Sequence, residues 1–173
     1  MAKDQIVELT WWQEQDIAGL KIICTPSRHY SGRQLFDQKA TFWSSWSIIG
    51  PQHRVYYSGD TGFSPHFARI GDRLGPFDLS IIKVGSYGPG PSWFDIHMFP
   101  EDAVRAHQAL RAERMLPVHW ATFNMAFHAW DEPINRTLKA AADSGVKVLT
   151  PRIGQMVDTH QPFKPDAWWK SVK

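Results

Sequence analysis

The chain has 173 residues, of which 43% are hydrophobic, and a formal net charge of +2. Domains average roughly 150 residues, so this length indicates one domain that can bury a core without disulfide or metal staples. The single cysteine, Cys24, excludes a disulfide framework and a cysteine-rich zinc finger. The small net charge argues against nucleic-acid binding, and no apolar run approaches the ~20 residues that span a membrane. Because the N-terminus does not resemble a signal peptide, we expect a cytoplasmic protein.

The first half of the chain predicts β-strands. Weak alternation over residues 5–10 and apolar residues over 19–25 predict a hairpin, whose second strand ends at Pro26. An aromatic-rich segment over 40–49 and the segment 53–58 predict two further strands, separated by a Gly-Pro turn.

The second half predicts strands that alternate with helices. Proline at the first position and acidic residues in the first turn predict a helix over 100–113, and Gly145 ends a second helix over 132–144. The predicted strands are 77–84, 115–119, 146–150 and 154–157. This order predicts an α/β fold with a mixed sheet and flanking helices. The segment 159–173 is polar, and we expect this tail to be loosely held.

Three predicted strands end at residues that commonly bind metal ions. His29 follows the second strand, Asp60 lies in a Gly-Asp-Thr-Gly turn after the fourth, and His119 ends the strand over 115–119. Each residue alone is more often structural or solvent-facing, but sites collect where strand ends and loops converge, so the combination favours a metal site. Imidazole and carboxylate ligands suit zinc, iron or manganese rather than calcium.

The other histidines are interpreted by their position. His97 precedes the helix over 100–113, where it can transfer a proton or orient a ligand, or else simply face water. His107 lies inside that helix and is interpreted as structural. Four histidines without a supporting pattern are assigned to the surface: His53, His66, His128 and His160.

Two further side-chain types have competing interpretations. Cys24 lies in an apolar strand, where a thiol is more often an inert core residue than a nucleophile. The tryptophans are partly explained as core, and some can line an apolar wall beside the site: Trp43, Trp46, Trp93, Trp120 and Trp130.

Five motifs follow one another along the chain: Thr25–Arg33, Tyr57–Phe63, Gly75–Leu79, His97–Val104 and Val118–Phe123. Together they resemble the metallo-β-lactamase superfamily, and in particular its branch containing N-acyl-phosphatidylethanolamine phospholipase D. The resemblance implies an αββα sandwich with a two-zinc centre, in which His29 binds one ion, Asp60 bridges both and His119 binds the other. It also implies that a metal-activated hydroxide attacks a phosphoester, with Asp60 and His97 as catalytic residues.

The chain departs from this superfamily in one large respect. A His-x-His-x-Asp-His motif should precede His29, but no histidine does. The chain therefore resembles the C-terminal half of the fold, a partial domain over 1–158, which implies at most weak zinc binding. An exposed sheet face would then be covered by the missing N-terminal half or by self-association. Two smaller departures are Ala121, where glycine is usual, and Phe99, where a capping Asn or Asp is common.

These observations predict a zinc-dependent hydrolase of the phosphodiesterase type that acts on a small-molecule or lipid phosphoester. No transmembrane segment is expected, and peripheral membrane contact stays open. Two alternatives remain. The chain can be an inactive fragment or assembly half, or it can be a lactonase or other ester-type hydrolase, because a fold does not fix a substrate.

Overall fold

The computed structural model describes residues 6–32, 36–90, 93, 95–123, 126–159 and 161–172. They form a seven-stranded sheet in the order β1-β2-β3-β4-β5-β6-β7. The strands are β1 (Glu14–Ile17), β2 (Leu20–Pro26), β3 (Ser44–Ile49), β4 (Arg54–Tyr57), β5 (Phe77–Lys83), β6 (Ala112–Val118) and β7 (Lys147–Val148). Helix α1 (His66–Leu74) follows β4, α3 (Pro100–Ala109) follows β5, and α4 (Glu132–Ser144) follows β6.

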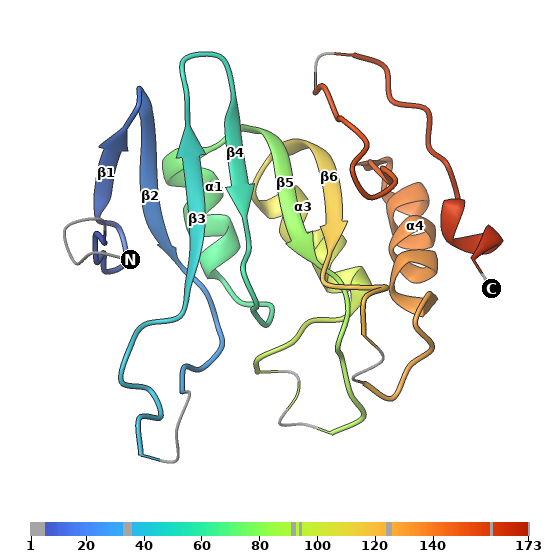
Figure 1. The fold of residues 1–173 in the computed structure, drawn as a ribbon, viewed down its shortest axis with the longest axis horizontal. Helices are drawn as coiled ribbons and strands as arrows, with labels where there is room; N and C mark the ends of the chain where they lie inside the picture. The colour runs from blue at the N-terminus through green and yellow to red at the C-terminus, as the bar shows by residue number, and fades with distance from the viewer. Residues whose placement is uncertain are drawn as a thin grey trace.

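The sheet is mixed, as predicted. Strands β1 to β4 pair antiparallel, and β4 to β7 pair parallel. Each parallel connection steps across the sheet in the same direction, so right-handed crossovers place their helices on one face. Figure 1 shows α1 and α3 behind the strands, and no helix of the described residues in front of them.

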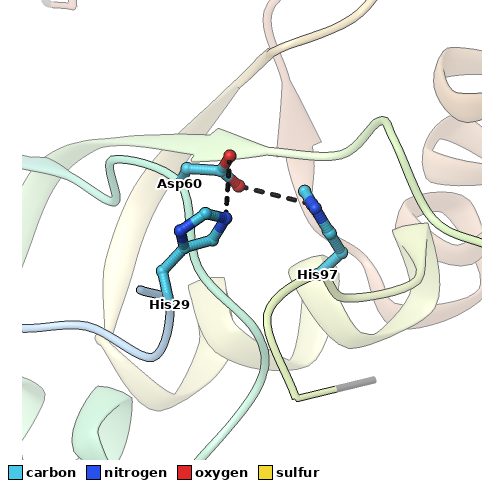
Figure 2. A group of neighbouring side chains, drawn as sticks. All are labelled: His29, Asp60 and His97. Carbon is cyan, nitrogen blue, oxygen red and sulfur yellow. Dashed lines mark ion pairs between the residues drawn. The ribbon is translucent and has the colours of Figure 1, made fainter. Parts of the chain in front are cut away.

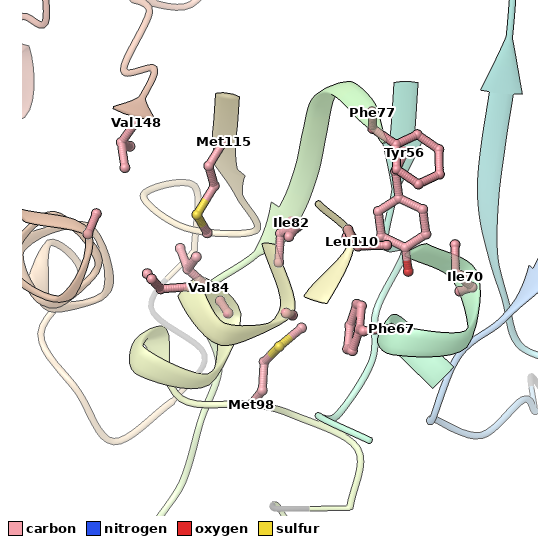
Figure 3. Packing of buried hydrophobic residues seen from close by; sticks show 14 residues of the cluster. Tyr56, Phe67, Ile70, Phe77, Ile82, Val84, Met98, Leu110, Met115 and Val148 are labelled. Carbon is pink, nitrogen blue, oxygen red and sulfur yellow. The ribbon is translucent and has the colours of Figure 1, made fainter. Parts of the chain in front are cut away.

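The helix-covered face holds the main core. Tyr56, Ile82 and Met115, from three neighbouring strands, pack with Phe67 of α1 and Leu110 after α3, and all five are essentially inaccessible (Figure 3). The strands are therefore anchored to the helices by close apolar packing on this side.

The opposite face, which we call the open face, is also apolar but only partly buried. The strand registers place one set of side chains on it: Ile17, Leu20, Ile22, Trp46, Ile48, Val55, Tyr57, Leu79, Ile81 and Leu116. Ile17, Leu20 and Tyr57 are 53%, 40% and 42% exposed. No helix of the described residues covers this face (Figure 1).

Several predicted element bounds are wrong. The first strand is β1 rather than 5–10, because the tight Ala18-Gly19 turn, with φ of 50° and 81°, joins β1 directly to β2. Helix α3 ends at Ala109 rather than 113, and no strand forms over 154–157.

Helix α1 was not predicted from the sequence. It carries few strongly apolar residues, and its buried side includes His66 and Gly71. The glycine is required, because a Cβ there would lie 2.1 Å from the carbonyl oxygen of Ala109. The surface assignment of His66 is therefore wrong, since α1 buries it against the core.

The burial of Cys24 and of the remaining histidines differs from residue to residue. Cys24 is buried and unpaired with another cysteine, and His107 is buried with its Nδ1 2.8 Å from Ser80 Oγ. His53 and His128 are half-buried, and His128 Nε2 accepts the backbone N–H of Ser86 at 3.0 Å. His160 lies outside the described residues.

The end of the tail is packed, contrary to expectation. Trp169, in the 3-10 turn η2 (Trp168–Ser171), is only 2% exposed, and its Nε1 donates to Asn135 Oδ1 of α4 at 3.1 Å. Trp168 stacks on Trp120 with ring centroids 5.6 Å apart. Indole burial and this hydrogen bond hold the tail against α4 and the loop after β6.

The buried histidine on α3 predicts an acid-sensitive fold. Burial lowers the pKa of His107 to about 4, against about 6.5 in an unfolded chain. Between these values the unfolded chain binds more protons, so the free energy of unfolding falls as pH is lowered through this window. The free energy of unfolding, measured in denaturant titrations, should fall between pH 7.5 and pH 5. We expect His107→Gln to make this fall smaller by about 2 kcal/mol. A variant as acid-sensitive as the parent would contradict this assignment.

Candidate metal centre

Asp60 lies in a turn that two glycines make possible. Gly59 follows β4 with a φ of 59°, and a Cβ there would lie 2.6 Å from the carbonyl oxygen of Ser44. A Cβ on Gly62 would lie 2.5 Å from the carbonyl oxygen of Asp95. Only glycine permits such close backbone approaches, so the motif fixes where the carboxylate stands.

The loop after β2 is tied to this turn. Arg28 N–H donates to Thr61 Oγ1, and Gly62 N–H donates to the Arg28 carbonyl oxygen, both at 2.8 Å. These bonds bring His29 Nε2 to 3.2 Å from Asp60 Oδ2. His29 Nδ1 donates to the Tyr30 carbonyl oxygen at 3.0 Å, so in the neutral ring Nε2 presents a lone pair to the carboxylate.

His119 approaches the same carboxylate oxygen from the end of β6. Its Nε2 lies 3.6 Å from Asp60 Oδ2, and its side chain is 39% exposed. Its backbone has a φ of 65°, and Gly85 leaves room for it, since a Cβ there would lie 2.1 Å from the His119 carbonyl oxygen.

The other oxygen of Asp60 faces His97 and an unpredicted residue, Lys83. His97 Nδ1 is 3.4 Å from Asp60 Oδ1, and Lys83 Nζ donates to the same oxygen at 2.6 Å. Lys83 Nζ also contacts His97 Nδ1 directly. Lys83 escaped prediction because it ends a strand whose pattern is that of a buried apolar segment.

The charges of the site follow from these contacts. Burial alone would raise the pKa of Asp60, but the adjacent imidazoles of His119 and His29 and the charge of Lys83 hold it well below its usual range. Burial would lower the pKa of His29, yet the contact with Asp60 raises it. Burial and the neighbouring Lys83 lower the pKa of His97 to about 4, so this ring is neutral near pH 7.

The donor atoms suit a metal ion. Ligand atoms of His29, Asp60 and His97 all lie within 4.8 Å of one another (Figure 2). Tetrahedral ligands about 2.0–2.1 Å from zinc stand about 3.3–3.4 Å apart. The distances of 3.2 Å and 3.6 Å from Asp60 Oδ2 to the nitrogens of His29 and His119 bracket that spacing, but His119 does not belong to the group of three whose ligand atoms all lie within 4.8 Å of one another. His29 Nε2 is buried without a hydrogen bond of normal geometry, as expected for a ligand atom.

The structure thus brings three predicted site residues, His29, His97 and His119, around the carboxylate of the fourth, Asp60. Of the expected aromatic wall, Trp93 lies beside His97, with ring centroids 5.2 Å apart. A cavity of about 320 Å³ is lined by Ser86, His119, Trp120, Thr122 and Phe123. A second, of about 260 Å³, is lined by Phe63, His97, Met98, Phe99 and Asp102.

Comparison with known proteins identifies the family. The sequence-family model described as the beta-lactamase superfamily domain matches residues 2–120 of this chain. The chain belongs to this superfamily. A protein of Mycobacterium tuberculosis, called uncharacterized, is 44% identical over 171 residues, covering 97% of this chain and 45% of that protein. The N-acyl-phosphatidylethanolamine-hydrolyzing phospholipase D 1 of Caenorhabditis elegans is 38% identical over 127 residues, covering 69% of this chain and 35% of the worm protein.

A solved structure supports the fold of this superfamily member. Igni18, a metallo hydrolase of the archaeon Ignicoccus hospitalis, matches with a TM-score of 0.67 and 24% identity, covering 87% of this chain and 59% of that one. The predicted α/β fold of metallo-β-lactamase type is thereby confirmed. The chain spans less than half the length of both curated relatives. Among the described residues, no helix has the length and apolarity needed to cross a membrane.

The backbone of the loop that carries His119 is strained at Ala121. Ala121 has a φ of 68°, in the left-handed region, which costs a residue with a Cβ about 1–2 kcal/mol. Glycine avoids that cost but loses about 0.5–1 kcal/mol of entropy on folding. We expect Ala121→Gly to raise the free energy of unfolding by about 0.5–1 kcal/mol in denaturant titrations.

Ala167→Gly is the matched control for this substitution. Ala167 is exposed and has a φ of −84°, so removal of its Cβ relieves no strain and leaves only the entropic cost. If Ala121→Gly destabilised the chain as much as the control, the backbone at Ala121 would not be strained.

Proposed function

We propose that this chain supplies three ligands, His29, Asp60 and His119, to the metal centre of a hydrolase. The observation that carries this proposal is the meeting of two imidazole nitrogens, from distant segments, at one carboxylate oxygen. Lys83 Nζ already pairs with Asp60 Oδ1 at 2.6 Å, whereas Asp60 Oδ2 faces imidazole nitrogens, which is an arrangement of donor atoms that a divalent ion could bind. The donor set favours zinc, with iron or manganese as other acceptable ions.

The roles of the chain's own residues follow from the site. A divalent ion bound there would lower the pKa of a water molecule and neutralise charge on a substrate oxygen. Asp60 stays ionised and orients the two histidines. His97 accepts a hydrogen bond from Lys83 at Nδ1, so its proton lies on Nε2, where it can donate to a leaving-group oxygen.

We propose a phosphodiester as the substrate class, because the similar worm protein is called a phospholipase D. Zinc-loaded chain is expected to hydrolyse bis(p-nitrophenyl) phosphate faster than p-nitrophenyl butyrate. The opposite preference would favour the ester-type alternative. No hydrolysis of either compound by a chain that binds zinc would favour the assembly-half alternative.

The role of Asp60 is tested by zinc binding itself. Loss of a residue that only supports a ligand costs roughly 10–100-fold in metal affinity, so loss of a direct ligand should cost about 100-fold or more. We expect Asp60→Asn to show this loss in competition titrations with a zinc-sensitive dye. Asp143→Asn, which changes an exposed carboxylate of α4, should leave affinity unchanged. Equal affinity in Asp60→Asn and wild type would remove the proposed ligand set.

We also propose that the open face packs against a second sheet. The mycobacterial relative and the Igni18 chain are long enough for one, since this chain covers 45% and 59% of them. Without that layer, burial of apolar area drives the open face to associate with copies of itself.

Association is tested by two charged substitutions on the open face. Ile17→Lys and Leu20→Lys should together lower the mass of the purified chain in size-exclusion chromatography with light scattering, because lysine opposes edge and face pairing. Ile153→Lys is the matched control, since Ile153 is 96% exposed and lies outside the sheet. A wild-type chain that is monomeric at all concentrations would contradict the expected self-association.

A further inference from the structure

Lys83 is a buried lysine inside the candidate metal centre. Its side chain has no exposed surface, and its backbone N–H donates to Ser58 Oγ at 3.1 Å. A buried ammonium is costly unless it is paired, and both polar contacts of its Nζ, with Asp60 Oδ1 and His97 Nδ1, are with residues of the centre. The position of Lys83 is therefore explained by the site rather than by packing.

The strand pattern shows that a lysine here serves no packing role. Residues 79, 81 and 83 project to the same side of β5, and the first two are Leu79 and Ile81 of the open face. An apolar residue at 83 would continue this series without the cost of burying a charge. The charge must be offset by what it contacts, and that is the carboxylate of Asp60.

The contacts divide the two oxygens of Asp60 between two sets of partners. Oδ2 faces the nitrogens of His29 and His119, at 3.2 Å and 3.6 Å. Oδ1 faces His97 Nδ1 at 3.4 Å, which is also a suitable spacing for two ligands of one ion, but Lys83 Nζ lies between them in contact with both. The second pair of donor atoms is thus already occupied by a cation.

We propose that Lys83 takes the place of a metal ion between Asp60 Oδ1 and His97, so that the centre holds one divalent cation, on the Oδ2 side of Asp60. This inference rests on the proposed function, because it uses the same ligand set. A second divalent ion on Oδ1 would have to displace the ammonium or bind within a few ångströms of its positive charge. Repulsion at that range is strong in a partly buried site.

Zinc titration of the full chain tests this proposal without an activity assay. Native mass spectrometry of the wild type is expected to show one zinc per chain at saturation. Lys83→Met keeps most of the side-chain volume and removes the charge, so it should bind the first zinc about tenfold more tightly and accept a second. Lys147→Met, which alters the exposed lysine of β7, should match the wild type.

Further outcomes separate this inference from the ligand proposal. Lys83→Arg keeps the charge and should retain one zinc per chain, and a second zinc in the wild type would contradict the proposal even where Lys83→Met does not fold. Two zinc ions in the wild type, or no gain in affinity in folded Lys83→Met, would overturn the role of Lys83. Zinc binding that persists in Asp60→Asn would instead overturn the ligand set.

Discussion

The direction in which strands run through the sheet determines both the site and the open face. Strands β2, β4, β5 and β6 all run the same way, because β2 and β4 are each antiparallel to β3 and the later pairs are parallel. Their carboxyl ends therefore share one edge, where His29, Asp60, Lys83 and His119 meet. The same stepwise order places the crossover helices on one face and leaves the other without a helix among the described residues.

Asp60 provides the electrostatic centre of that edge. An anionic side chain with three histidines and a lysine around it is held ionised. Lys83 pairs with the carboxylate, so the residues proposed as metal ligands are already held close together. Preformed ligands cost less entropy to assemble, which favours binding at this edge over binding by an unfolded chain.

The fold class predicted from the sequence is confirmed, and the residues predicted for the site lie close together, while their role as metal ligands stays a proposal. His29, Asp60 and His119 were found because each follows a strand, and strand ends that share an edge bring their residues together. His97 was found from its place before a helix. Lys83 was missed because a strand pattern does not show which end residue turns toward a charge. Helix α1 was missed because its buried face includes a histidine and a glycine, which hydrophobic periodicity does not count as core.

The positions of Asp60 and His119 are fixed by backbone contacts among the loops at the end of this sheet. Asp60 is fixed by backbone bonds between the loop after β2 and the turn after β4, and His119 by the close approach of Gly85. None of these contacts involves open-face side chains, so a second layer is not needed to position these ligands. Lys83 differs, because it projects on the same side of β5 as Leu79 and Ile81. It therefore links the candidate metal centre to the surface on which we expect the second sheet to pack.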